Sequence, residues 1–111
     1  MHRHTISFRH AFAGLLTALR TQPNFRIHLA LSALAIGLGV WRHLDSTQWA
    51  LLSLVIALGL VVELINTAIE FTVDLITQEH NLLAKYAKDV SAAAMLIYAF
   101  GAVVVALWLF I

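Results

Sequence analysis

The sequence predicts an all-α integral membrane protein with three transmembrane helices and an N-terminal amphipathic helix on the membrane surface. Two observations support this prediction. First, 61% of the 111 residues are apolar and only 12% are charged, whereas soluble globular domains have roughly 45–50% apolar and about 25% charged residues. Second, the apolar residues are gathered into runs close in length to the hydrocarbon core of a bilayer. A small soluble enzyme and a disordered chain are therefore excluded, and residues 1–111 are expected to form a single domain.

The N-terminal amphipathic helix is predicted over residues 6–21. Its apolar residues recur at the spacing of one helical face, and they are Phe8, Ala11, Phe12, Leu15, Leu16 and Leu19. Such a face lies either in the membrane surface or against the transmembrane bundle. Both contacts can occur in the same helix.

The first two spans are predicted over residues 23–42 and 46–76. Pro23 fits the first turn of a helix, where its missing N–H costs no hydrogen bond. Asp45, Ser46 and Thr47 are suitable N-caps for the second helix. The apolar run of that helix ends at Val62, so its remaining residues are expected to extend into the cytoplasm.

The third span is predicted over residues 84–111, which carry no charge after Asp89. Basic residues are most frequent before the first span and between the second and third spans, and the full set is Arg3, Arg9, Arg20, Arg26, Arg42, Lys85 and Lys88. The positive-inside rule therefore predicts a multi-pass protein of the cytoplasmic membrane, with the N-terminus in the cytoplasm and the C-terminus outside.

Several classes of chemistry are excluded by composition. The chain has no cysteine, which rules out disulfides, thiolate metal sites and cysteine nucleophiles. The net charge is +1, and no basic stripe with interleaved aromatic residues is present. No nucleic-acid partner is therefore expected.

Polar residues gather at the end of the second span. Glu63, Asn66, Glu70 and Asp74 fall within an arc of roughly 80° on one helical face. A carboxylate inside a membrane costs about 2.5–3.5 kcal/mol on insertion scales, and acids four residues apart repel each other. A bound divalent cation, for which magnesium suits oxygen ligands, would compensate these charges. The lysines before the third span are the other candidate, and a solvated charged face is the simplest alternative.

A second polar cluster, formed by Lys85, Lys88 and Asp89, lies directly before the third span. Acids for magnesium, a lysine for phosphate and backbone N–H groups at a helix start are components of a nucleotide site. No Walker-type or protein-kinase glycine-rich loop is present. The residues alone therefore leave the reaction open. A small proton-coupled transporter using Glu63 and a holin-like or scaffold protein remain alternatives.

Two motifs are long and specific: ELINTAIE at residues 63–70, followed by VDL at 73–75, and AKYAKDVSAAA at residues 84–94. With residues 7–14 and 24–29, they closely resemble the bacterial integral-membrane diacylglycerol kinase and undecaprenol kinase family over nearly the whole chain. The segment NFRIHL at residues 24–29 is more similar to the undecaprenol kinase branch.

The resemblance implies a lipid kinase that transfers the γ-phosphate of Mg-ATP to the hydroxyl of a membrane lipid alcohol, undecaprenol or diacylglycerol, at the cytoplasmic interface. It implies that Glu63 is the general base and that Asn66 hydrogen-bonds the phosphate or the reacting hydroxyl. By the same resemblance, Glu70 holds magnesium beside the nucleotide, Lys88 neutralises the phosphates and Asp89 helps to place the nucleotide.

The resemblance also implies a homotrimer. Three helices expose too much surface to bury a polar stripe alone, so we expect active sites shared between neighbouring chains. Small residues in the spans permit the close helix contacts that such an assembly needs, and they are Ala30, Ala33, Gly37, Ser91, Ala92, Ala93 and Ala94.

The chain departs from the family pattern at two positions. Gln22 stands where the family commonly has a second metal-binding glutamate. Its carbonyl oxygen offers no charge, so we expect it to be a weak magnesium ligand. The second departure is Glu79-His80-Asn81, where the family commonly has Glu-Tyr-His, and no role is assigned to His80.

Overall fold

The chain forms four helices in this computed structural model, which describes residues 3–111 and the side chains from residue 8 onward. The helices are α1 (Arg3–Thr21), α2 (Pro23–Arg42), α3 (Ser46–Ile76) and α4 (Leu82–Phe110). Helices α2, α3 and α4 are each long and apolar enough to cross a membrane. The predicted all-α fold, with three spans after a shorter helix, is therefore confirmed, and the chain is a multi-pass membrane protein.

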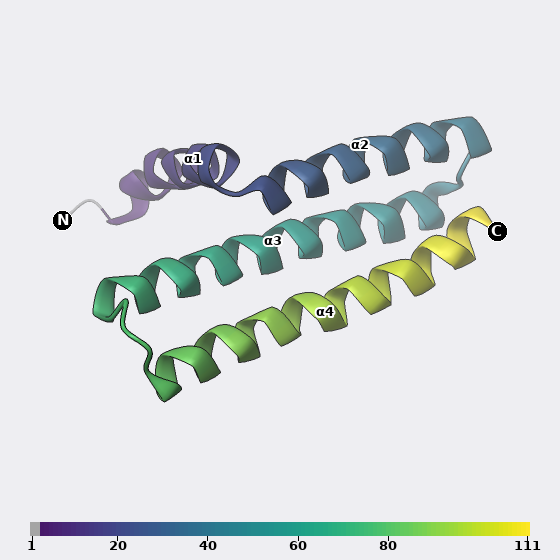
Figure 1. The fold of residues 1–111 in the computed structure, drawn as a ribbon. Coiled ribbons are helices and arrows are strands. Elements are labelled where there is room, and N and C mark those ends of the chain that lie inside the picture. The colour runs from purple at the N-terminus through teal and green to yellow at the C-terminus, as the bar shows by residue number, and fades with distance from the viewer. Residues whose placement is uncertain (1–2) are drawn as a thin grey trace.

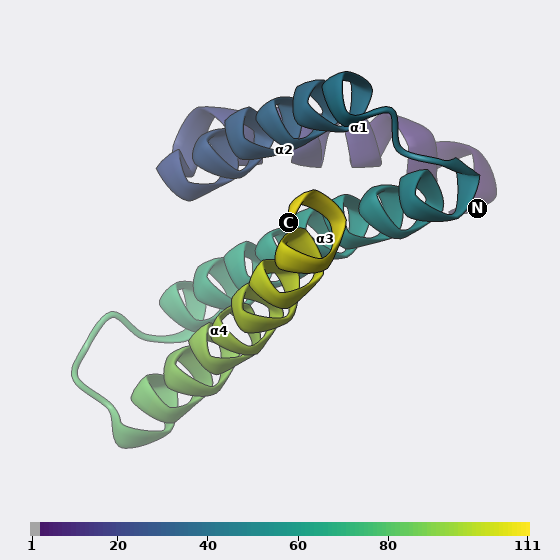
Figure 2. The ribbon, with the colours of Figure 1, turned by 90° about the vertical axis from the view of Figure 1, so that its right-hand side faces the viewer.

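Helices α2, α3 and α4 lie side by side and alternate in direction (Figure 1). Helix α3 is the central element, because it contacts α4 most extensively and also contacts α2 and α1. Comparison of Figures 1 and 2 shows that α1 lies across the bundle instead of along it. Helix α1 and the α3–α4 loop lie at one end of the bundle, and the α2–α3 loop and the C-terminus lie at the other.

Side-chain caps determine where α3 and α4 begin. The Asp45 carboxylate accepts from the Gln48 N–H at 2.8 Å, and the Gln48 side chain accepts from the Asp45 N–H at 2.9 Å, which forms a capping box. The Asn81 side chain accepts from the N–H groups of Leu83 and Ala84. Because Asn81 is the cap, α4 begins slightly earlier than the sequence pattern indicated.

The helix before the first span, α1, both packs on the bundle and exposes apolar side chains. Its Ala18 is only 2% exposed, whereas Phe8 and Phe12 are largely exposed. The Arg26 guanidinium of α2 donates to the Leu19 carbonyl of α1 at 2.7 Å and so links the two helices at their junction. Arg3, which contributes to the predicted orientation, lies outside the described side chains.

Side chains of the other two spans meet at Gly59 of α3. The rings of His28 from α2 and Tyr98 from α4 stack with centroids 5.7 Å apart and planes 27° apart. The Tyr98 hydroxyl donates to the Val55 carbonyl of α3 at 2.7 Å. A Cβ at Gly59 would overlap both the Tyr98 hydroxyl and the His28 ring. The absence of a side chain at Gly59 therefore lets α2 and α4 pack against α3 here.

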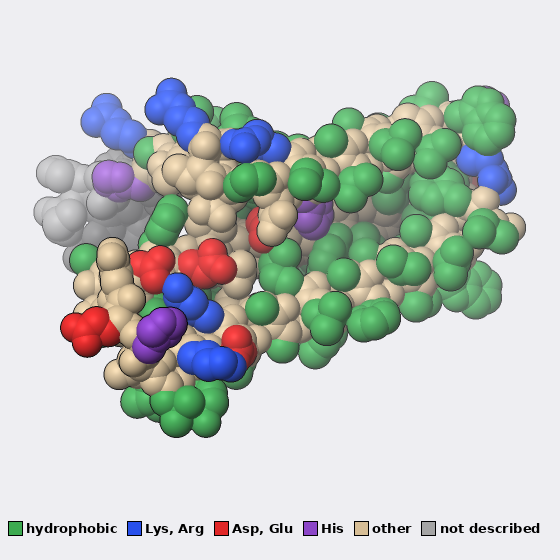
Figure 3. All heavy atoms as spheres, in the orientation of Figure 1, with side chains coloured by type: hydrophobic (Ala, Val, Ile, Leu, Met, Phe, Trp, Pro, Cys, Tyr) green, Lys and Arg blue, Asp and Glu red, His purple; other side chains and the backbone are tan. Residues whose placement is uncertain are grey.

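Charged side chains are concentrated at one end of the molecule. Figure 3 shows acidic and basic groups gathered around α1 and the α3–α4 loop, while most of the visible surface along the spans is hydrophobic. At the opposite end, the Arg42 guanidinium donates to the Phe110 carbonyl and joins the ends of α2 and α4. The candidate site lies at the charged end.

Candidate active site

Glu63 is buried where the apolar part of α3 ends, with only 3% of its surface exposed. One turn further along α3, Thr67 is also buried, and its hydroxyl donates to the Glu63 carbonyl at 3.0 Å. A carboxylate in this position is shielded from bulk water, so its interactions with other polar groups are strengthened. Glu63 is therefore placed where hydrocarbon meets the charged end of the bundle.

Two polar pairs join α3 to α4 beyond Glu63. The Ser91 hydroxyl donates to the Asn66 side-chain carbonyl at 2.6 Å. The Lys88 ammonium forms an ion pair with Asp74 at 2.7 Å, and both side chains are about half exposed. For Asp74, a lysine therefore supplies the positive partner that the row of acids requires.

Glu70 links the buried and the exposed parts of this row. Its side chain is half-buried, and it lies about two helical turns from Glu63 and about one turn from Asp74, the ion-pair partner of Lys88. The structure thus gathers a buried carboxylate, a second carboxylate and a lysine at one end of α3 and α4. The sequence placed these groups only on one helix face and in a nearby segment.

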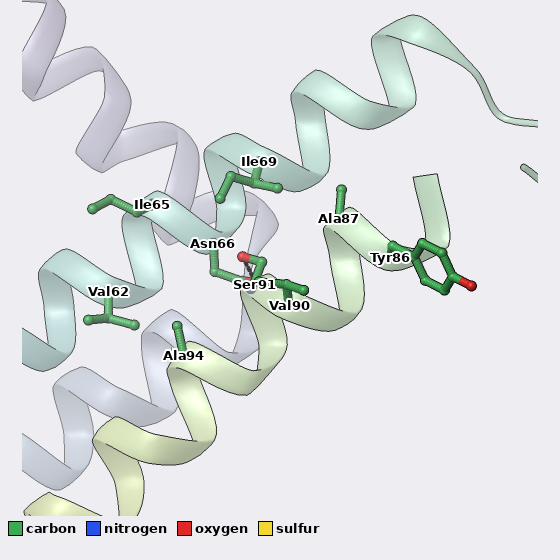
Figure 4. A pocket seen from close by; sticks show the side chains of 9 residues that line it. All are labelled: Val62, Ile65, Asn66, Ile69, Tyr86, Ala87, Val90, Ser91 and Ala94. Atoms are coloured by element: carbon green, nitrogen blue, oxygen red, sulfur yellow. Dashed lines mark hydrogen bonds between the residues drawn. The ribbon is translucent and has the colours of Figure 1, made fainter. Parts of the chain in front are cut away.

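A cavity of about 600 Å³ lies between α3 and α4 at this end. Figure 4 shows Asn66 and Ser91 pointing toward each other in its lining. Most of the other lining side chains are apolar, and the complete set is Val62, Ile65, Asn66, Ile69, Tyr86, Ala87, Val90, Ser91 and Ala94. The cavity therefore joins an apolar surface to the polar pair.

The remaining predicted site residues have local partners. Asp89 pairs with Lys85 of its own helix at 2.6 Å, and both side chains are largely exposed. The Gln22 side chain is half-buried at the α1–α2 junction and donates to the Thr21 hydroxyl at 3.2 Å. His80 is exposed in the α3–α4 loop. Asp89 and Gln22 therefore have polar partners in their own segments.

Within the described side chains, no group of three or more acids and histidines is placed to hold a metal by itself. Magnesium, however, is commonly bound by one or two carboxylates together with water and substrate phosphates. Glu70 offers one such carboxylate, one helical turn before Asp74, the partner of Lys88, and the Lys88 ammonium is a suitable partner for phosphate. The donor set therefore fits a magnesium ion that arrives with a nucleotide.

Sequence reasoning missed the contact between Ser91 and Asn66 and treated Ser91 only as a small residue. A signal was available, because Ser91 follows Lys88 by three residues and so shares its helical face. The burial of Thr67 and the close packing at Gly59 were missed as well.

Comparison with known proteins gives a consistent result along the chain. Residues 9–110 match the family model described as prokaryotic diacylglycerol kinase. An undecaprenol kinase of Bacillus subtilis is 39% identical over 105 residues, which cover 95% of this chain and 85% of that protein. A diacylglycerol kinase of Escherichia coli K12 is 34% identical over 95 residues, which cover 86% of this chain and 78% of that protein.

A diacylglycerol kinase of Synechocystis sp. is 44% identical over 101 residues. The match covers 90% of this chain but only 58% of that relative. The chain therefore spans less than two thirds of the length of the Synechocystis protein. The relatives carry two different lipid names, so the comparisons leave the acceptor lipid open.

Proposed function

The chain belongs to the prokaryotic diacylglycerol kinase family of lipid kinases, and from that membership we propose that it transfers the γ-phosphate of ATP to the hydroxyl of a membrane lipid alcohol. The acceptor is undecaprenol or diacylglycerol. Family membership favours this activity over a proton-coupled transporter, which the acidic row of α3 alone left open.

One observation carries the proposal: α3 and α4 bring the buried Glu63 carboxylate and the partly exposed Lys88–Asp74 ion pair to the same end of the bundle. Glu63 is buried at the end of the apolar run, where a lipid headgroup would present its hydroxyl. Lys88 is partly exposed, where a nucleotide would present its phosphates. The cluster therefore has a side suited to each substrate.

Each residue has a defined part in the proposed reaction. Glu63 takes the proton from the lipid hydroxyl while the oxygen of that hydroxyl forms a bond to the γ-phosphorus. The bond between the γ-phosphorus and the oxygen bridging to ADP then breaks, and ADP leaves with that electron pair. Asn66 hydrogen-bonds the transferred phosphate or the reacting hydroxyl, and Lys88 exchanges its partner Asp74 for phosphate oxygens. Asp89 helps to place the nucleotide.

Glu70 is the proposed magnesium ligand, and Gln22 offers a weaker, uncharged oxygen. Magnesium, when bound, neutralises part of the phosphate charge. Replacing Glu70 by glutamine keeps the shape of the side chain but removes its charge. We expect Glu70→Gln to raise the magnesium concentration needed for half-maximal activity or to abolish activity.

Orientation and assembly are also part of the proposal. Helix α1 and the first turns of α4 carry five of the seven Lys and Arg residues and lie at the same end of the bundle. The positive-inside rule places that end in the cytoplasm. The C-terminus is then outside the cytoplasmic membrane. We propose a homotrimer with sites shared between neighbouring chains. Crosslinking in mild detergent that yields only monomer would contradict this assembly.

The deciding experiment uses the purified protein in detergent micelles with magnesium and ATP labelled at the γ-phosphate. Diacylglycerol and undecaprenol are supplied in separate reactions. We expect labelled lipid phosphate from one of the two alcohols, which identifies the acceptor. If neither alcohol is phosphorylated while the protein remains folded, the proposed activity is wrong.

A further inference from the structure

The hydroxyl of Ser91 bonds differently from five other helical hydroxyls. Serine and threonine in a helix usually donate to a carbonyl of the preceding turn. That pattern is followed by Thr17, Thr21, Ser32, Thr67 and Thr72. Ser91 is 7% exposed, yet its hydroxyl crosses from α4 to α3 and donates to Asn66 at 2.6 Å. The bond therefore joins two helices at the candidate site.

In this bond the Asn66 carboxamide presents its acceptor end to Ser91. A carboxamide has an acceptor end, Oδ1, and a donor end, Nδ2. Because Ser91 donates to Oδ1, the Nδ2 group is turned away from Ser91 and is available to other acceptors. Asn66 shares its helical face with Glu63 and Glu70. An amide turned the other way would direct its oxygen toward carboxylates and incoming phosphates, which repel it.

The surroundings of Ser91 and Asn66 strengthen the hydrogen bond between them. Asn66 and Ser91 line a cavity whose other side chains, apart from Tyr86, are apolar. Hydrogen bonds in such surroundings face little competition from water and are stronger than on an open surface. The same surroundings make an unsatisfied amide costly.

We propose that Ser91 is a positioning residue of the kinase, which holds the Asn66 carboxamide with Nδ2 directed at an oxygen of the transferred phosphate or of the lipid hydroxyl. This inference rests on the proposed function and adds a residue to its site. Ser91 itself touches neither substrate and acts through Asn66.

The first test compares Ser91→Ala with Ser91→Thr in the lipid phosphorylation assay. Loss of the hydroxyl should lower kcat about tenfold and leave the KM values for ATP and lipid nearly unchanged. Ser91→Thr keeps a hydroxyl and should restore most of the lost rate. Ser32→Ala is the matched control, because Ser32 is similarly buried but bonds only to its own helix. It should keep the parental rate.

A second test is independent of activity. The chain has three asparagines, Asn24, Asn66 and Asn81, so ¹⁵N-asparagine labelling gives a side-chain amide spectrum that is simple to assign. Ser91→Ala should shift the Asn66 amide pair and leave those of Asn24 and Asn81 in place. An unshifted Asn66 pair would overturn the inference.

A double mutant separates positioning from a general structural effect. In an Asn66→Ala background, Ser91→Ala should cause no further loss of kcat, because the group that it positions is gone. A further tenfold loss would overturn the inference. If the parent phosphorylates lipid and Ser91→Ala is equally active, the inference fails while the proposed function stands. An inactive parent would overturn both.

Discussion

The contact between α3 and α4 is built differently at its two levels. Near Gly59, the spans are held by close packing, with His28 and Tyr98 occupying the space where a side chain would be. Toward the charged end, the same two helices are joined by the polar pairs Asn66–Ser91 and Asp74–Lys88. The level at Gly59 depends mainly on shape, with one hydrogen bond from Tyr98 to the Val55 carbonyl, and the level toward the charged end depends on side-chain hydrogen bonds and charge.

This difference separates stability from chemistry. A substrate atom cannot replace either side of a contact made by shape complementarity, so a change there only weakens the packing. A polar contact can exchange its partner for a substrate oxygen with little net change in the number of hydrogen bonds. We therefore expect changes at the partly exposed Asp74–Lys88 pair to alter catalysis at nearly constant stability, and changes at Gly59 to do the reverse.

The largest expected effect is on catalysis, from Glu63→Gln. Loss of a general base should reduce kcat on the order of 10²–10⁴-fold, while the melting temperature in detergent stays close to that of the parent. Asp45→Asn is a suitable control, because it removes one negative charge at the opposite end and asparagine also caps helices. A Glu63→Gln protein that retains the parental rate would show that Glu63 is not the base.

Gly59→Val tests the packed level. The new side chain would overlap the Tyr98 hydroxyl and the His28 ring, and overpacking typically costs about 1–3 kcal/mol. The melting temperature should fall, and the rate per folded molecule should change little. Gly101→Val is the control, because a Cβ there has no neighbour within 4 Å. Equal melting temperatures for the two variants would contradict the role given to Gly59.

Lys88→Ala and Asp74→Asn separate the two partners of one ion pair. Removing Lys88 should raise the KM for ATP about tenfold, because a charged donor to phosphate is lost. Asp74→Asn removes only the competing acid and should change this KM much less. Both variants should lose less than about 1 kcal/mol of stability, since the two side chains are about half exposed. Similar KM values in the two variants would argue against phosphate binding by Lys88.

The smallest effect is expected from Arg42→Gln, at the end opposite the site. This change weakens the link to the Phe110 carbonyl. A single exposed hydrogen bond of this kind contributes about 1 kcal/mol, so the melting temperature should fall slightly and the rate should be unchanged. A large loss of activity would show that the two ends of the bundle are coupled, which would contradict the separation of the packed from the polar contacts.

The fold was largely predictable from local sequence, because hydropathy and capping residues act over a few positions. The capping residue Asp45 and the first-turn proline Pro23 begin α3 and α2 as expected. Helix α4 begins earlier than predicted because Asn81 caps it, and this cap was not identified from the sequence.

The site was predictable in composition but not in pairing. The row of acids on α3 and the lysines before the third span were evident, yet the sequence did not specify that Lys88 pairs with Asp74 or that Ser91 bonds to Asn66. These contacts depend on how α4 is placed along and around α3. That placement is set partly by Gly59, whose importance follows from the absence of a side chain.

The contact at Gly59 also has a mechanical consequence. Glu63 lies one helical turn from Gly59, where side chains of α2 and α4 pack closely against α3. A thicker or thinner bilayer would therefore be accommodated by tilting the spans together, with no sliding of α3 past its neighbours. The distance between Glu63 and Lys88 would then be conserved while their height relative to the lipid headgroups changes, which makes the turnover rate sensitive to acyl-chain length.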